Sequence, residues 1–530
     1  MAPKQRTRID EARMFGRFVR GLRGFLSQPI PLEHCSELLR RAHERRRDSF
    51  LSLMRRGVYE NPTSPYLELL RWAGVEYGDL VRMIREGGVE ETLGRLFEAG
   101  VYITIDEFKG RLPIRRGTRR LEVSASDFDN PLPVGHFLGA TGGSRGSGQR
   151  LIVDLDLVGQ DAAAHGLFLQ AFGITELPLS VWRPVAPGAS GTKKVLMHAK
   201  LRLPMGRWFS QNHPGFFVHP KSALFTGALT HASRWWGGSI PAPRFRPLEE
   251  AGLIASWLSQ QPVPGVHFDT NVSSAVRICQ AATEAGFSLE TTFLRLGGEP
   301  LTKNKLEVCE RAGAKVVCHY SMSEVGHIAM ACADPLACDD VHVRSDKMGV
   351  IQRPAPPPLA SLSSFYLTTL APCCPKIMLN VASGDYGTMK RRRCSCDFGK
   401  VGFDLHLWSI RSYEKLTTGG MQFLGSDLIQ LLDEVLPASF GGGPTDYQLV
   451  EAEQEDGRTI VQLLVSPGVG SIDEERCFEI VCRFLSSRAP ENRMMVDRLR
   501  EEAALRLVRR EPYATRASKV LTLHRLQRQP

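Results

Sequence analysis

Apolar residues in the first hundred positions recur at mixed three- and four-residue intervals, the period of an amphipathic helix. The spacing is clearest between the turn signals Asn61-Pro62 and Gly87-Gly88, at Leu67, Leu70, Trp72, Val75, Leu80 and Ile84. We therefore predict that residues 1–100 form a helical extension that packs on the domain that follows it.

Residues 101–410 alternate between short runs rich in β-formers and helical patterns. The predicted strands lie at 151–157, 194–201, 294–296 and 315–318, and the predicted helices at 273–285 and 301–312. This alternation is typical of an α/β domain with parallel strands. We predict one large α/β domain over 101–410.

The pattern changes after Leu407. Two short strands at 447–453 and 459–465 and an exposed helix at 473–485 precede a basic end. A small α+β domain over 411–530 fits this order, so the expected fold class is α/β with a second, smaller C-terminal domain.

Composition excludes disordered and fibrous chains. The chain has 530 residues, of which 42% are apolar and 23% charged, enough for two to four domains with full cores. Its formal net charge of +10 favours anionic partners, and nucleotide phosphates satisfy this as well as nucleic acid does. Arginines near the end, from Arg493 to Arg528, alternate with Leu, Val and Glu as on a solvated helix face, so we do not expect nucleic acid as the partner.

The N-terminus has no apolar core segment and no small-residue cleavage site, and no run reaches about 18 uninterrupted apolar residues. We therefore expect a cytoplasmic protein that does not enter a membrane. The twelve cysteines are then expected to be reduced core residues, or metal ligands where they cluster. The sequence leaves open whether the chain forms a homodimer.

A glycine-rich loop at 138–149 is suited to wrapping an anion. Glycine lets backbone amides approach phosphate oxygens, and hydroxyl side chains add donors. The candidate phosphate-binding residues are Thr141, Gly142, Gly143, Ser144 and Gly146. The loop matches neither a Walker loop nor G-x-G-x-x-G, and a flexible Gly/Ser linker has the same composition.

Short motifs follow this loop in a fixed order. They are Gly297-Gly298-Glu299-Pro300-Leu301, Tyr320-Ser321-Met322-Ser323-Glu324, Ser383-Gly384-Asp385, Arg411 and Lys519. In this order they resemble the motifs of the adenylate-forming superfamily of acyl-CoA synthetases and adenylation domains. The phenylacetate-CoA ligase branch is most similar, since its G-A-E-P-W, Y-G-L-S-E and R-S-D-D motifs resemble 297–301, 320–324 and the segment from Arg411 to Gly420.

The resemblance covers roughly residues 100–525 and implies an AMP-forming acid-thiol ligase with a small mobile C-terminal domain. ATP and an aryl or acyl carboxylic acid would give acyl-AMP and pyrophosphate, and coenzyme A would then take the acyl group. Lys519 and Glu324 would be catalytic, Glu324 as the Mg²⁺ ligand. The nucleotide-binding residues would be Gly298, Glu299, Pro300, Tyr320, Ser321, Ser323, Asp385 and Arg411.

This chemistry needs such residues because a carboxylate must attack a phosphate, and both are anions. Charge neutralisation and positioning then dominate the barrier. Lys519 would place a compact positive charge on the carboxylate and the α-phosphate, and Asp385 would accept both ribose hydroxyls.

A zinc site is a second expectation. Cys394-Ser395-Cys396 follows a basic run, while Cys332, Cys338 and His342 lie upstream. Three thiolates and one imidazole suit tetrahedral Zn²⁺. The branch often has a cysteine, L-H-V and C-x-C in this order, which implies Cys332, His342, Cys394 and Cys396 as ligands of a structural zinc, with Cys338 as the alternative to Cys332.

Three positions depart from the superfamily pattern. Gln149 stands where many members have lysine, and Ser321 replaces a glycine, so ATP binding is in doubt at both. Tyr413 replaces the aspartate expected at the hinge, which puts the ease of domain rotation in doubt.

The sequence leaves open which carboxylic acid is the substrate and which molecule accepts the acyl group. An aromatic cluster either lines an apolar acid pocket or belongs to the core, and we favour the core: Trp208, Phe209, His213, Phe216, Phe217, Trp235 and Trp236. An alternative acceptor of the acyl group is the phosphopantetheine thiol of a carrier protein, or another acceptor in a biosynthetic (secondary) pathway. A second alternative is a degenerate, non-adenylating binding protein.

Overall fold

We describe the chain from a computed structural model. It describes residues 8–133, 135, 137–140, 150–185, 189–212, 220–356, 362–415, 422–453, 459–488, 505–515 and 518–526. These residues cluster into two compact units. The first holds the described residues of 1–140, 150–245 and 317–410, and the second those of 246–316 and 411–530.

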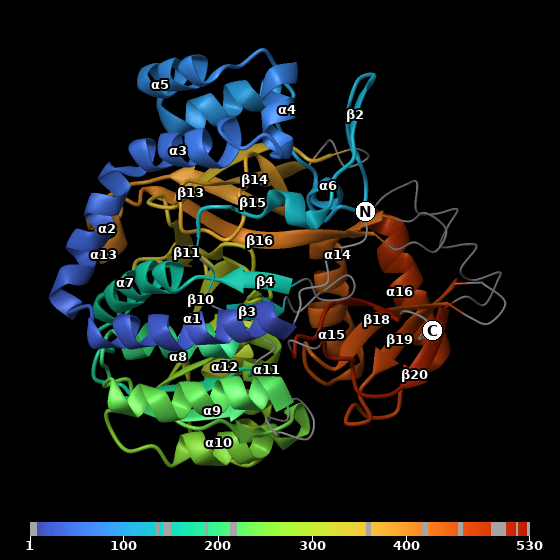
Figure 1. The fold of residues 1–530 in the computed structure, drawn as a ribbon. Helices are drawn as coiled ribbons and strands as arrows, with labels where there is room; N and C mark the ends of the chain where they lie inside the picture. The colour runs from blue at the N-terminus through green and yellow to red at the C-terminus, as the bar shows by residue number, and fades with distance from the viewer. Residues whose placement is uncertain are drawn as a thin grey trace. The chain divides into compact units, whose positions relative to one another are not determined.

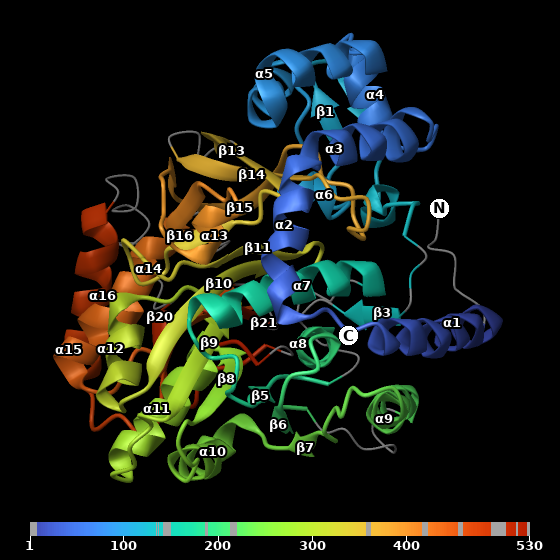
Figure 2. The same ribbon diagram turned by 90° about the vertical axis from the view of Figure 1, so that its left-hand side faces the viewer.

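The first unit begins with helices, as the sequence predicts for residues 1–100. They are α1 (Arg8–Ser27), α2 (Cys35–Glu44), α3 (Arg46–Met54), α4 (Pro65–Trp72), α5 (Tyr77–Glu98) and the short α6 (Ile105–Phe108). Thr104 and Glu107 form a reciprocal capping box at the start of α6. Figures 1 and 2 show α3, α4 and α5 grouped beside β13 (Met348–Pro354), and α5 contacts that strand.

Antiparallel strands make up the sheet of the first unit after residue 317. In sheet order they are β13, β14 (Ser363–Thr369), β15 (Val381–Arg391), β16 (Leu405–Lys415), β12 (Val341–Val343), β11 (Gly326–Ala331) and β10 (Lys315–Met322). The short helix α13 (Asp397–Lys400) lies between β15 and β16 in the chain. The expectation of parallel strands is therefore wrong for this part of the chain, because its strands follow one another through short connections instead of helical crossovers.

Parallel pairing does occur earlier in the first unit. β5 (Leu179–Trp182), β6 (Met205–Ser210) and β7 (Arg244–Phe245) are parallel. They alternate with α7 (Leu155–Ala171), α8 (Ala189–Lys200) and α9 (Pro220–Trp235). Two further hairpins are β1 (Ile114–Arg116) with β2 (Arg119–Leu121) and β3 (Phe137–Ala140) with β4 (Arg150–Val153).

Two predicted strands of this region are corrected. Residues 194–201 lie mostly in helix α8, and 151–157 divide between β4 and the start of α7. Val195, Leu196 and Met197 are all buried in one core with α1 and α7. A continuous apolar run fits a buried helix as well as a buried strand, which is why the sequence pattern misled.

The second unit has a parallel pair, β8 (Val266–Asn271) and β9 (Thr292–Gly297), with α10 (Ala251–Ser259), α11 (Val272–Glu284) and α12 (Lys303–Arg311). Every residue of both strands is buried, as expected for parallel strands covered on both faces. The helices predicted at 273–285 and 301–312 and the strand at 294–296 are thereby confirmed.

The C-terminal part of the second unit contains β17 (Gln422–Leu424) and a small sheet of order β20 (Leu505–Arg509), β19 (Thr459–Val465), β18 (Tyr447–Glu453) and β21 (Leu523–Leu526). Both strands predicted at 447–453 and 459–465 have the expected bounds. Helix α16 (Glu474–Arg488) packs on this sheet, together with α14 (Gly425–Gln430), η6 (Leu431–Val435) and α15 (Leu436–Phe440), around one apolar core (Figure 1).

No helix among the described residues is both long enough and apolar enough to cross a bilayer.

Candidate functional site

The predicted site residues fall into three groups in the structure, two in the first unit and one in the second. Thr141, Gly142, Gly143, Ser144, Gly146 and Gln149 lie outside the described residues. The backbone on either side of them is described: β3 and β4 pair antiparallel, with Ala140 opposite Arg150.

Tyr320 and Asp385 meet in the first unit. The Tyr320 hydroxyl donates to Asp385 Oδ2 at 2.5 Å, and the Ser383 hydroxyl accepts from the Asp385 amide at 3.0 Å. Burial, and then the Asp385 carboxylate, raises the pKa of Tyr320 well above its usual range, so the phenol stays protonated and remains a donor. The structure thus brings together two predicted nucleotide-binding residues that are 65 positions apart.

Glu324 is buried and forms an ion pair with Lys109, which follows α6 directly. Sequence reasoning missed Lys109, because nothing in its local pattern distinguishes it from an ordinary surface lysine. The carboxylate predicted to bind Mg²⁺ therefore already has a cationic partner. Ser321 is partly buried at an irregularity of the β10–β11 pairing, and Ser323 is exposed.

The second unit holds Lys519 beside the glycine motif. Gly298 has φ +87°, and a Cβ there would lie 2.8 Å from Lys519 Cε and 3.1 Å from its Nζ. A Cβ at this position would force the end of the lysine side chain to shift, and this close approach is the steric match between the two predicted residues.

The Lys519 turn, by which we mean Thr515 and residues 518–520, contacts the end of β8 and the start of α11. Asn271 Nδ2 donates to the Ser518 carbonyl at 3.4 Å, and the Val520 amide donates to the Ser273 hydroxyl at 3.3 Å. Within the turn, the Thr515 amide donates to the Lys519 carbonyl at 2.8 Å. Ser518 has φ +57°, which is uncommon for a residue other than glycine.

Glu299 lies in the same group. Its carboxylate accepts from the Ser273 amide at 2.8 Å and from the Ser273 hydroxyl at 2.9 Å. Burial raises the pKa of Glu299, while the Ser273 hydrogen bonds and the charges of Lys305 and Lys519 lower it. Asn271 and Ser273, where β8 ends and α11 begins, are residues that the sequence analysis missed. A strand followed directly by a helix was the available signal.

Pro300 follows Glu299 and is partly buried. Arg411 lies in β16, and its charge is among the causes that oppose the burial-raised pKa of Asp433. The backbone of Tyr413 pairs with Leu424 in β17, and its side chain lies outside the description.

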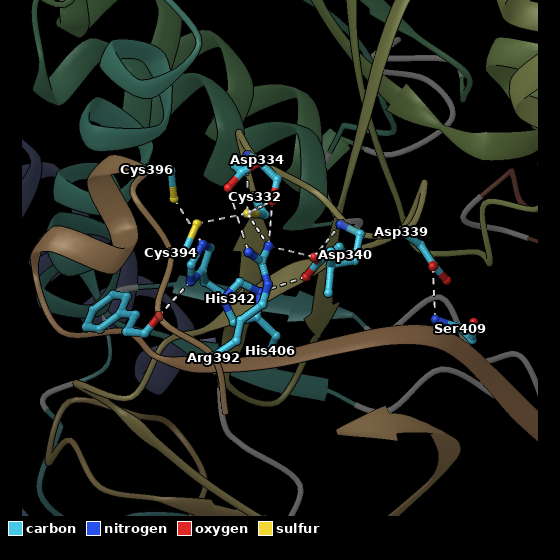
Figure 3. A network of polar contacts seen from close by, with 12 residues as sticks. Cys332, Asp334, Asp339, Asp340, His342, Arg392, Cys394, Cys396, His406 and Ser409 are labelled. Carbon is cyan, nitrogen blue, oxygen red and sulfur yellow. Dashed lines mark hydrogen bonds and ion pairs between the residues drawn. The ribbon is translucent and has the colours of Figure 1, made fainter. Parts of the chain in front are cut away.

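The third group is the Cys–His cluster, formed by Cys332, His342, Cys394 and Cys396 in the first unit (Figure 3). The donor atoms of these four residues lie within 4.8 Å of one another. Cys332 Sγ is 3.5 Å from Cys394 Sγ, and Cys396 Sγ is 3.0 Å from His342 Nε2. Tetrahedral Zn²⁺ with Zn–S bonds near 2.3 Å places sulfurs about 3.8 Å apart, so the donor set fits this ion. Cys338 is not part of the four-residue group.

The surroundings of the cluster also fit a metal. His342 Nδ1 donates to the Phe403 carbonyl at 2.6 Å, so the lone pair of Nε2 faces the thiols. The Asp334 amide and Arg392 Nη2 donate to Cys332 Sγ at 3.4 and 3.3 Å. The Cys332–Cys396 hydrogen bond is the largest cause both of the lowered pKa of Cys396 and of the raised pKa of Cys332.

The aromatic residues considered for an acid pocket do not form one group. Trp208 and Phe209 are buried in β6, which confirms the core for these two, and Trp236 packs against the same core. Trp235 at the end of α9 is 87% exposed. His213, Phe216 and Phe217 lie outside the described residues.

No protein-family model and no curated protein sequence matches the chain. Among solved structures, similar ones include a 2-hydroxyisobutyryl-CoA ligase in complex with 2-HIB-AMP and CoA, with 13% identity over 94% of this chain and 91% of that one, at a TM-score of 0.46. An anthranilate CoA ligase in complex with anthranoyl-AMP has 9% identity over 72% and 65% of the two chains, at a TM-score of 0.39. An amide bond synthetase from Marinactinospora thermotolerans has 11% identity over 95% and 98%, at a TM-score of 0.40.

Proposed function

We propose that the chain is an adenylate-forming ligase of the phenylacetate-CoA ligase-like branch. It would activate an aryl or acyl carboxylic acid as acyl-AMP and pass the acyl group to the thiol of coenzyme A. The observation that carries the proposal is the steric match of Lys519 and Gly298 beside Glu299, because it joins two motifs that are more than 200 positions apart in the order typical of this superfamily.

In the first half-reaction, a carboxylate oxygen of the acid attacks the α-phosphorus of ATP, and the bond from that phosphorus to pyrophosphate breaks. Lys519 Nζ offsets the charge that develops between the two anions. Its ammonium group needs no deprotonation for this role, and the small Gly298 lets it approach the backbone. Asp385, oriented by Tyr320, would accept the ribose hydroxyls.

In the second half-reaction, the thiol sulfur attacks the acyl carbon, AMP leaves, and the thiol proton passes to solvent. The N- and C-terminal parts, 101–410 and 411–530, would act as a large and a small mobile domain, with a hinge at Tyr413.

Magnesium would be held by Glu324, where it would neutralise phosphate charge. Because Lys109 now pairs with that carboxylate, the ion has to displace or share the ammonium. Lys109 would then be close to the phosphates, so it supplies a second positive charge to the same reaction.

Zinc would be held by Cys332, His342, Cys394 and Cys396. Four protein ligands leave no position for water, so the metal would stabilise the fold and take no part in the chemistry.

The test is ATP–pyrophosphate exchange with a panel of aryl, amino-aryl and acyl acids, followed by product analysis with coenzyme A. Exchange that depends on an acid supports adenylation, and a thioester formed with coenzyme A supports the proposed acceptor. A thioester that appears only with a phosphopantetheinyl carrier protein would replace coenzyme A by that acceptor. No exchange with any acid, together with salt-sensitive nucleic-acid binding, would favour the degenerate binding protein.

A further inference from the structure

The Cys–His cluster bounds a loop that reaches the last residues of the first unit. Cys332 and His342, at the two ends of this loop, belong to the cluster, and residues 333–341 lie between them. The loop is closed by its own backbone, since the Cys332 amide donates to the Asp340 carbonyl at 3.1 Å. Any ion that joins the two ends therefore fixes this loop.

Asp340 ties the loop to its surroundings. Its Oδ1 accepts from His406 Nδ1 at 2.8 Å, and its Oδ2 accepts from Arg392 Nη2 at 3.0 Å and from the Leu336 amide at 2.9 Å. The same Arg392 nitrogen donates to Cys332 Sγ (Figure 3). The guanidinium thus joins a cluster thiol to the loop carboxylate and offsets the negative charge of both.

Asp339, the neighbouring residue, faces the middle of β16, at the last two residues of this strand that belong to the first unit. Its Oδ1 accepts from the Ser409 amide at 2.9 Å (Figure 3). Its Oδ2 accepts from the Ile410 amide at 3.1 Å. Its side chain is buried, so these two bonds are shielded from water.

The segment that Asp339 holds is bent. Ser409 has φ +52°, a conformation that a serine adopts only where neighbouring groups hold it. β15 also approaches there, because a Cβ on Gly387 would lie 2.8 Å from the Trp408 carbonyl oxygen and 2.9 Å from that of Ser409. The carboxylate supplies acceptors for two amides at the point where this bend interrupts regular strand geometry.

We propose that Asp339 is a positioning residue through which metal occupancy of the Cys–His cluster orders the middle of β16, at Ser409 and Ile410. Arg411 follows Ile410 directly in the chain, so the carboxylate also fixes the backbone from which Arg411 starts. The inference rests on the proposed function in two respects, the metal at the cluster and the nucleotide-binding role of Arg411.

The experiment is residue-resolved hydrogen exchange of the full chain without substrates, after its zinc content has been measured. Four samples are compared: the metal-loaded protein, the same protein after chelation, Asp339→Ala and Asp339→Asn. Asp334→Ala is the matched control, because Asp334 lies on the same loop, its side chain is exposed and forms a 3.8 Å ion pair with Arg392, and its backbone bonds to Cys332 and Arg392 survive the substitution.

We expect the Ser409 and Ile410 amides to exchange about tenfold faster or more in Asp339→Ala, since each loses a bond to a charged acceptor. Chelation should have the same effect on the wild-type chain and little further effect on Asp339→Ala. Asp339→Asn keeps its metal and one acceptor oxygen, so at least one of the two amides should exchange faster. Asp334→Ala should match the wild type.

The inference is overturned if chelation leaves both amides unchanged, if Asp334→Ala equals Asp339→Ala, or if the purified protein binds no zinc. A second readout is the KM for ATP in pyrophosphate exchange, which we expect to rise severalfold in Asp339→Asn while the KM for the acid stays the same. An equal rise in the KM for ATP and in the KM for the acid would refute the link to Arg411. The hydrogen-exchange experiment contains no substrate. It therefore tests the positioning role of Asp339 even if the protein proves not to adenylate any acid.

Discussion

The Cys–His cluster and the Lys519 turn are held by opposite kinds of contact. The cluster draws its four side chains from the start and end of a loop and from a C-x-C segment. Its ligand atoms contact one another, the Phe403 carbonyl and the Arg392 guanidinium. The Lys519 turn is hydrogen-bonded within itself, and its contacts with Ser273 and Asn271 include hydrogen bonds of 3.3 and 3.4 Å. Under the proposed function, the first arrangement would serve as a permanent attachment, and the second would hold a residue that is released after adenylation.

Removing the proposed metal should have the largest effect, because it would act on the cluster that we propose as the permanent attachment. A structural zinc present at a thousandfold its Kd contributes about 4 kcal/mol to the free energy of unfolding. We expect chelation or Cys396→Ala to lower the denaturation midpoint accordingly, as followed by circular dichroism. Cys338→Ala, outside the cluster, is the control; equal midpoints for the two cysteine variants would show that the cluster holds no stabilising ion.

Lys519→Ala should come next and should leave the fold intact. Loss of one charge-stabilising group typically costs about 10²-fold or more in rate. We expect a loss of this size in pyrophosphate exchange, with an unchanged denaturation midpoint. A variant that adenylates at the wild-type rate would remove Lys519 from the mechanism.

Gly298→Ala tests the steric match with a smaller effect. The new Cβ would lie 2.8 Å from Lys519 Cε, so the lysine has to shift, and we expect adenylation to fall about tenfold. Gly286→Ala is the matched control, because Gly286 has φ +70° but nothing within 4 Å of the added Cβ. If both variants lose the same activity, backbone strain and not the approach of Lys519 is the cause.

The smallest effect concerns pH. Burial raises the pKa of Glu299 above its unfolded value, so the folded state loses stability as the pH rises through this raised pKa. Glutamine cannot ionise. Glu299→Gln should therefore gain stability relative to the wild type between about pH 4 and pH 8.

This gain is measured as the difference in denaturation midpoint at the two pH values. The exposed Glu310→Gln serves as the control and should show no such trend. A difference for Glu299→Gln that shrinks as the pH rises would contradict the raised pKa.

Much of the fold followed from sequence patterns. The C-terminal strands at 447–453 and 459–465 were predicted with their bounds, because alternating apolar positions with turn signals are a local property. The strand predicted at 194–201 was wrong. Its apolar run is compatible with the period of a helix and with that of a strand, and burial against other elements of the fold favours the helix. The pairing of β12 with β16 joins residues that are more than 60 positions apart, and no local pattern carries it.

The site shows the same division. The four members of the Cys–His cluster and the Tyr320–Asp385 pair came from motif order and do meet in the structure. Lys109, Asn271, Ser273 and Asp339 did not, because their roles arise from what the fold places opposite them. An ordinary lysine or aspartate acquires a role through its neighbours and carries no signal of its own.

The most direct test of the central claim is acid-dependent ATP–pyrophosphate exchange measured side by side for the wild type, Lys519→Ala and Gly286→Ala. We predict exchange with at least one aryl or acyl acid in the wild type and in Gly286→Ala, and a loss of about 10²-fold or more in Lys519→Ala. Exchange that is absent with every acid, or that is equal in all three proteins, would contradict the account.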